Sequence, residues 1–195
     1  YLSTDFCNHP VGRFILPVIK NHANNQVEIY AIDGGRIRDT YNKQIEEACK
    51  QLINISAMND IEAARKISDL NLDVLVELSG YTSGSRIGVL IHRPSKIQLS
   101  YLGYFAPTYL KCIDGWIGDN ILFKKLNQTQ MEAHKLLNIE GGYMTLQDGK
   151  LPEPDRETSS TVKFGTFNHS RKLSIETIKL FCKSLQDLHK YILIG

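Results

Sequence analysis

The sequence predicts an α/β fold, a Rossmann-like parallel sheet covered by helices, and three observations support this class. Short β-prone runs alternate with longer helical segments along most of the 195 residues. The helical segments place apolar residues at i, i+3 and i+4, which gives each helix one buried face. The helical connections run to roughly 10 to 15 residues, a length that suits right-handed crossovers between parallel strands.

The first part of the chain alternates between strands and helices. Strands are expected in the β-prone runs at 1–4, 26–32 and 73–78. The turn signal Asp33-Gly34-Gly35 ends the second of these strands. Helices are expected where apolar residues recur on one face, at Val11–Val18, Ile45–Leu52 and Ile61–Ile67, the last with Asn59 or Asp60 as its N-cap.

The rest of the chain continues this pattern and then changes composition. After a Gly/Ser loop, we expect a short helix near Arg86–His92, strands at Lys96–Tyr101 and Trp116–Ile117, and a helix at Gln128–Leu137. A polar stretch with two prolines indicates a linker, and a strand (162–167), a helix (174–188) and a strand (191–194) then form one βαβ unit. We therefore predict an N-terminal lobe over 1–150, a linker over 151–161 and the start of a second lobe over 162–195.

Composition and charge narrow the class of partner. The net charge of +2 comes from 23 basic and 21 acidic residues mixed along the chain, so no basic stripe indicates nucleic-acid binding. No apolar run reaches the roughly 18 residues of a membrane span, and the opening residues form no signal peptide, so we expect a soluble, cytoplasmic protein without membrane partners. Four widely spaced cysteines favour reduced, buried thiols over a zinc knuckle or a disulfide framework. Both ends of the chain are strand-like runs, and we expect them to lie inside a longer protein.

Candidate site residues follow the predicted strands, because ligands bind beyond the carboxyl ends of open parallel sheets. His9 precedes Pro10, a favoured first residue of a helix, and the positive end of a helix dipole suits a neutral histidine that acts as a base. The alternative is a His9 that only caps or packs. For Gly80, Gly84 and Gly103, the alternative to a ligand site is ordinary turn geometry.

A second group of candidates follows the strand at 162–167. Lys172 and Arg171 either bind an anion beside a helix start or form a solvated charged pair. Neither G-x-G-x-x-G nor G-x-x-x-x-G-K-[ST] occurs, which disfavours dehydrogenases and P-loop enzymes. The residues alone indicate an α/β ligand-binding domain of open function.

Four segments, taken in order, resemble the catalytic region of the O-linked N-acetylglucosamine transferase family, glycosyltransferase family 41, which includes the plant SPINDLY proteins. The family opens this region with S-x-D-F-x-x-H-P, and continues with DILV-x-L-x-GYT-x-G-x-R, RPAPIQ…WLGYPG and FNQLYK. The matching segments here are Ser3–Gly12, Leu72–Arg86, Arg93–Tyr104 and Gly165–Lys172.

The resemblance implies a GT-B fold of two Rossmann-like lobes, usually preceded by tetratricopeptide repeats, of which this chain covers the first lobe and the opening of the second. It implies inverting, metal-independent transfer, without a cofactor, of one sugar from a nucleotide-sugar donor to Ser or Thr of a protein acceptor. His9 matches the family's candidate base, and Lys172, with Asn168 and His169, matches its diphosphate contact. The sugar and acceptor pocket is expected to involve Gly80, Tyr81, Thr82, Leu102, Gly103 and Tyr104.

Departures from the family pattern leave the donor open. Ser68 stands where animal members have a second active-site histidine, Phe105-Ala106 replaces Pro-Gly, and His169 and Arg171 replace Gln and Tyr. The leading hypothesis is N-acetylglucosamine transfer from UDP-N-acetylglucosamine. The alternatives are a SPINDLY-like O-fucosyltransferase that uses GDP-fucose, favoured by Val-Glu-Leu at 76–78, and an inactive sugar- or peptide-binding relative. The chain by itself is expected to be inactive.

Overall fold

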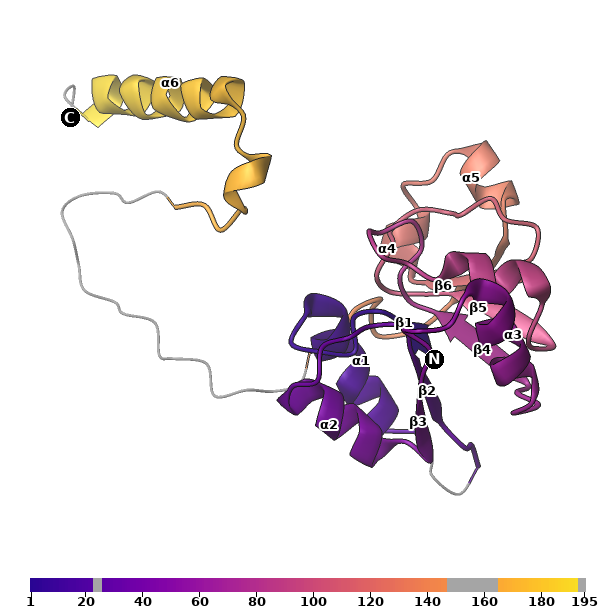
Figure 1. The fold of residues 1–195 in the computed structure, drawn as a ribbon. Coiled ribbons are helices and arrows are strands. Elements are labelled where there is room, and N and C mark those ends of the chain that lie inside the picture. The colour runs from indigo at the N-terminus through magenta and orange to yellow at the C-terminus, as the bar shows by residue number, and fades with distance from the viewer. Residues whose placement is uncertain (23–25, 147–164, 193–195) are drawn as a thin grey trace. The chain divides into compact units, whose positions relative to one another are not determined.

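The computed structural model describes residues 1–22, 26–146 and 165–192. The chain divides into two compact units, Tyr1–Lys150 and Leu151–Gly195 (Figure 1). The predicted linker over 151–161 lies outside the described residues.

The first unit contains a seven-stranded sheet in which every neighbouring pair is parallel. The order is β3-β2-β1-β4-β5-β6-β7, so the winding reverses at β1, as in doubly wound folds. This confirms the predicted α/β class. The strands are β1 Leu2–Ser3, β2 Tyr30–Asp33, β3 Gln51–Asn54, β4 Val74–Glu77, β5 Ile97–Ser100, β6 Gly115–Gly118 and β7 Lys135–Asn138.

Helices cover both faces of this sheet (Figure 1). Alternate strand residues point to opposite faces, so Ala31 packs with helices α1 and α2, whereas the next residue, Ile32, packs with α3 and η1. Each face therefore has its own apolar core. The four elements are α1 Pro10–Lys20, α2 Thr40–Ala48, α3 Asp60–Ser68 and the 3-10 helix η1 Ile87–His92.

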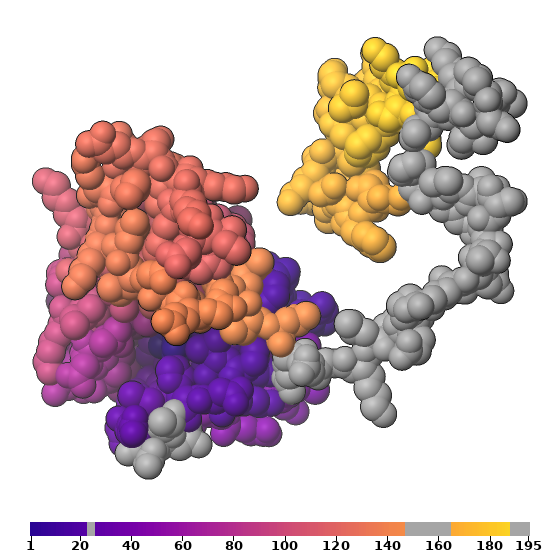
Figure 2. All heavy atoms as spheres, turned by 180° about the vertical axis from the view of Figure 1, so that it is seen from behind, coloured from indigo at the N-terminus to yellow at the C-terminus, as the bar shows by residue number. Residues whose placement is uncertain are grey.

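The last part of this unit, with helices α4 (Asn120–Phe123) and α5 (Gln128–Glu132), closes one end of the sheet. Figure 2 shows this orange segment lying directly against the indigo opening of the chain. Tyr143 is buried in the same core as α1, and the Thr145 hydroxyl donates to the Phe14 carbonyl at 2.8 Å. The end of the unit is thus joined to its first helix.

Two elements differ from the sequence prediction. Leu52, predicted on a helix, lies in β3 opposite Ala31 of β2. The predicted helix Gln128–Leu137 ends at Glu132, and Leu136 and Leu137 lie in β7 opposite Trp116 and Ile117. In both places strand pairing with a distant segment overrides a local helical pattern.

The second unit contains a 3-10 turn, η2 Ser170–Lys172, followed by α6 Ile175–Ile192. Residues 165–167 of the predicted strand 162–167 have no regular structure, and its first three residues lie outside the described segments. The strand prediction at 191–194 is wrong for Tyr191 and Ile192, which end α6. The run from Ile175 to Ile192 contains no Gly or Pro, and a helix satisfies its own backbone hydrogen bonds without a partner strand.

All four cysteines are free thiols. Cys7 is buried, as expected, whereas Cys49 and Cys112 are half-buried and Cys182 is exposed, so the expectation of burial is wrong for these three. None of the helices in the described segments combines the length and apolarity needed to cross a lipid bilayer.

Candidate functional site

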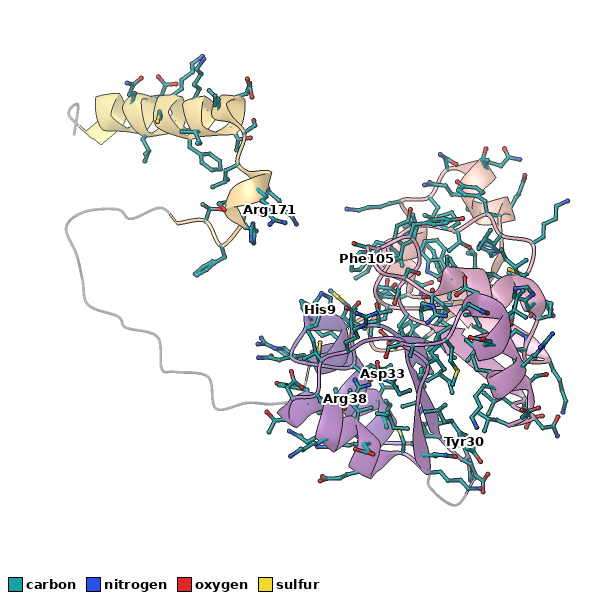
Figure 3. All side chains as sticks on the ribbon, viewed as in Figure 1. His9, Tyr30, Asp33, Arg38, Phe105 and Arg171 are labelled. Atoms are coloured by element: carbon teal, nitrogen blue, oxygen red, sulfur yellow. The ribbon has the colours of Figure 1, made fainter. Side chains whose placement is uncertain are left out.

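The carboxyl ends of β1, β4 and β5 meet at the point where the order of the sheet reverses. This is where open α/β sheets bind ligands, beside the strand at which the winding changes direction. Figure 3 shows Tyr30 and Asp33 at opposite ends of β2, with His9 and Phe105 on the Asp33 side. The loops that carry the predicted site residues of the first unit follow β1, β4 and β5, so they begin at this carboxyl edge.

His9 is the N-cap of α1, directly before Pro10. Its Nδ1 atom accepts the Val11 amide at 3.3 Å, and the Asp5 Oδ2 atom lies 3.8 Å from the same nitrogen. The side chain is 46% exposed, so the ring both caps the helix and remains open to solvent. The two interpretations of His9, as a cap and as a reactive group, are compatible.

Contacts from α2 hold the segment that carries His9. The Asp39 carboxylate, which is the N-cap of α2, accepts the Asn8 amide at 2.6 Å. Asn42 is buried, and its amide group donates to the Phe6 carbonyl at 2.9 Å and to Asp33 Oδ2 at 3.0 Å. The position of His9 therefore depends on a helix that follows it by some thirty residues.

Asp33 anchors this network at the end of β2. Its carboxylate accepts the Gly35 amide at 2.7 Å and an Arg38 guanidinium N–H at 2.7 Å. Burial raises the pKa of Asp33, while these donors oppose that shift. The sequence prediction treated Asp33 only as part of a turn. The signal that could have identified it is a carboxylate at the last position of a predicted strand.

Glu77 ends β4 with a buried carboxyl group, 1% exposed. The amides of Ser79 and Gly80 donate to its two oxygens at 2.6 and 2.8 Å. Burial raises the pKa of Glu77 to about 7, the two amides oppose the shift, and the Asp5 charge adds to it. Glu77 therefore shapes the loop after β4 and changes charge near neutral pH.

The loops after β4 and β5 are in close contact at two glycines. A Cβ atom on Gly80, whose φ is +54°, would lie 2.4 Å from the Cβ of Tyr104. A Cβ on Gly103 would lie 2.1 Å from the Leu78 carbonyl oxygen and 3.0 Å from a methyl group of Val11 on α1. Real Cβ atoms do not approach other atoms so closely, so both positions require glycine. Turn geometry alone therefore does not explain these two glycines.

The other predicted pocket residues differ in exposure. Tyr81 is half exposed, and its ring meets that of Tyr104 edge to face, with centroids 5.6 Å apart. The Thr82 hydroxyl turns back to the Ser79 carbonyl at 2.8 Å. Leu102 belongs to the apolar core and is 1% exposed, so its side chain is not on the open edge.

The candidates Asn168, His169 and Lys172 lie in the second unit. His169 caps η2, its Nδ1 atom accepting the Arg171 amide at 3.2 Å, and the Asn168 side chain donates to Thr166 Oγ1 at 3.0 Å. Lys172 ends this turn and is exposed. These residues form a local group of their own, and their role at a diphosphate stays a prediction.

In the described segments, no three His, Cys, Asp or Glu side chains come together as metal ligands would.

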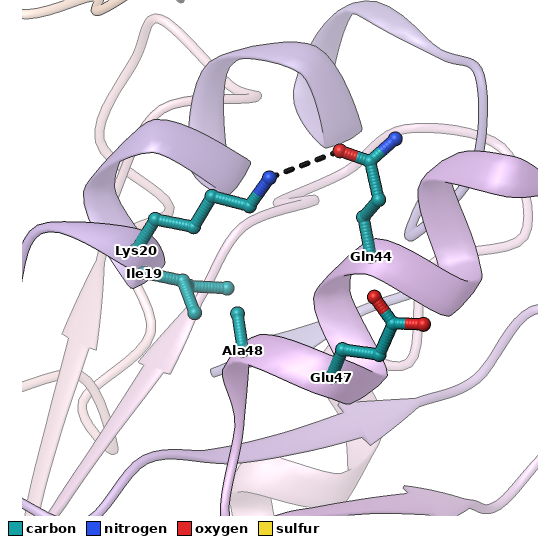
Figure 4. Close-up of a pocket in the computed structure, with 5 residues that line it drawn as sticks. All are labelled: Ile19, Lys20, Gln44, Glu47 and Ala48. Carbon is teal, nitrogen blue, oxygen red and sulfur yellow. Dashed lines mark hydrogen bonds between the residues drawn. The ribbon is translucent and has the colours of Figure 1, made fainter.

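A hollow between α1 and α2 is lined by Ile19, Lys20, Gln44, Glu47 and Ala48, and the Lys20 ammonium already donates to Gln44 at 3.0 Å (Figure 4). It lies near the ends of both helices, whereas His9 lies at the start of α1.

The linkage of Glu77 to protons yields a prediction about stability. The pKa of Glu77 in the folded state is about 7, above the ordinary 4.5, so protonated Glu77 stabilises the folded state. This stabilisation is complete below pH 4.5 and is lost as pH rises towards 7. At about 1.4 kcal/mol per pKa unit, the unfolding free energy should fall by on the order of 3 kcal/mol over this window relative to Glu77→Gln. Urea unfolding followed by the fluorescence of Trp116, the single tryptophan, measures both proteins.

Glu77→Gln is the matched variant because the amide has the same shape and does not titrate. The glutamine side chain keeps only one oxygen for the Ser79 and Gly80 amides. This loss should change the unfolding free energy of the variant by the same amount at every pH. Parallel stability curves for the two proteins between pH 4.5 and 7 would show that Glu77 is ionised throughout.

The comparisons with known proteins agree on one family. The family model for glycosyl transferase family 41 matches residues 1–145. A probable UDP-N-acetylglucosamine–peptide N-acetylglucosaminyltransferase SEC of Arabidopsis thaliana is 26% identical over 95% of this chain and 20% of its own length. The SPINDLY protein of Oryza sativa subsp. japonica, also named as a probable UDP-N-acetylglucosamine–peptide N-acetylglucosaminyltransferase, is 25% identical over 95% of this chain and 21% of its own length.

A solved structure supports the fold. A mutant O-GlcNAc transferase of Thermobaculum terrenum superposes with a TM-score of 0.69 at 23% identity, over 74% of this chain and 28% of that one. The chain spans about a fifth of the length of the two curated relatives.

Proposed function

The chain belongs to glycosyl transferase family 41, and we propose that its parent protein transfers N-acetylglucosamine from UDP-N-acetylglucosamine to Ser or Thr hydroxyls of proteins, with inversion. The observation that carries this proposal is the position of His9. An exposed imidazole caps α1 at the edge where the sheet reverses, within 4 Å of a carboxylate. The activities named for the plant relatives support the choice of donor and acceptor.

Inverting transfer requires one displacement. The acceptor oxygen bonds to the anomeric carbon while the bond from that carbon to the diphosphate oxygen breaks, and the nucleoside diphosphate departs with the bonding electrons. The hydroxyl proton must pass to a base, and the departing diphosphate must be stabilised by positive charge or hydrogen-bond donors.

The ring proton of a neutral His9 can lie on either of the two ring nitrogens. While Nδ1 accepts the Val11 amide, a neutral ring carries its proton on Nε2. A ring that instead carries its proton on Nδ1, towards Asp5 Oδ2 at 3.8 Å, has a free Nε2 that can accept a proton. In this proposal Asp5 selects the second arrangement when the acceptor binds.

The diphosphate contact is assigned to the second unit, in keeping with the family resemblance. Lys172 and Arg171 are both exposed cations in the turn before α6, and the Lys172 ammonium would contact the departing phosphates. Asn168 and His169 lie next to them and supply further polar groups. A lysine at the diphosphate would take the place that a divalent metal has in other sugar transferases.

Replacing His9 by alanine in the full-length parent enzyme should lower kcat/KM by about 100- to 10,000-fold, the usual range for a lost general base. Initial rates of transfer to a Ser/Thr peptide, with radiolabelled UDP-N-acetylglucosamine, measure this. His92→Ala is the matched control, since His92 is also exposed but lies at the end of η1, before β5.

Equal rates for His9→Ala and wild type would overturn the assignment of the base. A donor panel separates the alternatives for the parent enzyme: preference for GDP-fucose would identify the SPINDLY-like activity, and no transfer from any donor would identify an inactive relative.

Transfer by the parent enzyme should continue without divalent metal, because the proposed charge on the diphosphate comes from Lys172. Rates in excess EDTA should match those without it. Activity that EDTA abolishes and Mn²⁺ restores would contradict this mechanism.

The 195-residue chain alone should neither transfer sugar nor bind UDP or GDP tightly. One charge-assisted contact contributes about 1.5 to 3 kcal/mol, whereas micromolar binding requires roughly 8 kcal/mol. Calorimetric titration with UDP and with GDP should therefore give dissociation constants of about 1 mM or weaker. A micromolar value would place the whole nucleotide site within these residues.

A further inference from the structure

His134 lies between α5 and β7 and is buried, with 8% of its surface exposed. Its Nε2 atom accepts the Tyr109 amide at 3.2 Å and lies 3.1 Å from the Thr108 hydroxyl. An Nε2 that accepts a backbone N–H carries no proton, so the ring is neutral with its proton on Nδ1.

The segment that His134 holds is connected to the candidate sugar and acceptor pocket. Thr108 is 2% exposed, and its carbonyl accepts the Tyr81 hydroxyl at 2.7 Å. Tyr81 packs edge to face on Tyr104, and Tyr104 fills the space in front of Gly80. A continuous series of contacts thus leads from His134 through Thr108 to the loop after β4.

The backbone of this segment adopts a conformation that needs support. Tyr109 has φ = +58°, in the left-handed region that non-glycine residues rarely occupy. Such residues persist only where the surroundings hold them. The His134 ring provides this support at the amide of Tyr109 itself.

We propose that His134 is a positioning residue for sugar transfer, which holds Thr108 and Tyr109 so that Tyr81 and Tyr104 shape the pocket. This inference rests on the proposed function. It assigns a role to a residue outside the segments that carry the family resemblance.

The charge of His134 governs this support. Burial lowers the pKa of His134, and the backbone of Ile113 opposes the shift. Five ionisable side chains of the flanking segments are exposed to solvent: Tyr109, Lys111, Asp114, Glu132 and Lys135. Cys112 is half-buried, and burial raises the pKa of its thiol. A proton on Nε2 would face the Tyr109 amide proton, so acidification should release the segment.

The first test uses the 195-residue chain and does not depend on a donor. Nitrogen-15 NMR should show the Nδ1-protonated tautomer of His134 at pH 8. His134→Leu, which removes both hydrogen bonds, should lower the exchange protection factor of the Tyr109 amide by about tenfold or more, whereas His134→Gln, which can donate and accept, should stay within about threefold of wild type. Wild-type protection should also fall on acidification.

The second test measures kcat and KM for a Ser/Thr peptide in the parent enzyme. His134→Leu should raise KM by about tenfold with a smaller change in kcat, and His134→Gln should stay within about threefold of wild type. Adding Tyr109→Gly to the Leu variant should recover part of the loss, since glycine adopts positive φ without strain.

Wild-type Tyr109 protection or wild-type KM in His134→Leu would overturn the proposal, as would a Gln variant as impaired as Leu. Trp116 fluorescence shows whether His134→Leu folds. If it does not, the proposal is decided by the results for His134→Gln and by the pH dependence of Tyr109 amide protection in the wild type. A parent protein that transfers no sugar would contradict the proposed function. The NMR comparison would still show whether His134 supports Tyr109.

Discussion

The parallel pairing of β1 between β2 and β4 is the interaction on which the rest of the structure depends. This strand has only two residues, yet the Ile32 amide donates to the Tyr1 carbonyl at 2.7 Å and the Leu78 amide to the Leu2 carbonyl at 3.0 Å. Because the order of the sheet reverses at β1, its carboxyl end is the place where loops from both halves diverge and leave room for a ligand. The candidate base follows six residues after this strand.

Around that point, buried polar groups and close backbone contacts fix the loops. Asn42 joins the ends of β1 and β2, Glu77 holds the turn after β4, and Gly103 lets the loop after β5 touch both the Leu78 carbonyl and α1. Chemistry that needs reacting atoms held in a fixed geometry benefits from such support, since small displacements of a catalytic group are costly. The exposed groups at this edge, His9 and Tyr81, thus rest on rigid, buried neighbours.

The family membership of the chain supports the proposed function. In the proposed division of roles, the first unit provides the base and the pocket walls, and the second provides the cations for the diphosphate. The apolar residues of α6, including Ile178, Phe181 and Leu185, are exposed in the described part of the second unit. Their spacing is that of a helix that buries one face.

The sequence by itself determined the α/β class, most of the alternation of strands and helices, and the place of His9 at a helix start, because these depend on periodicity and local capping chemistry. It limited the cap of α3 to Asn59 or Asp60, and the structure places the cap at Asn59. Tertiary structure decided what local pattern does not contain. Leu52 and Leu136 are strand residues because distant strands pair with them, and His134 takes its hydrogen-bond partners from a segment some 25 residues away. Asp33 and Glu77 have donors close to them in sequence, but the packing of the whole fold buries them. The burial and the hydrogen-bond partners of a side chain depend on the whole fold. The sequence therefore shows which residues carry a carboxylate or an imidazole, whereas three-dimensional packing decides their charge and their partners.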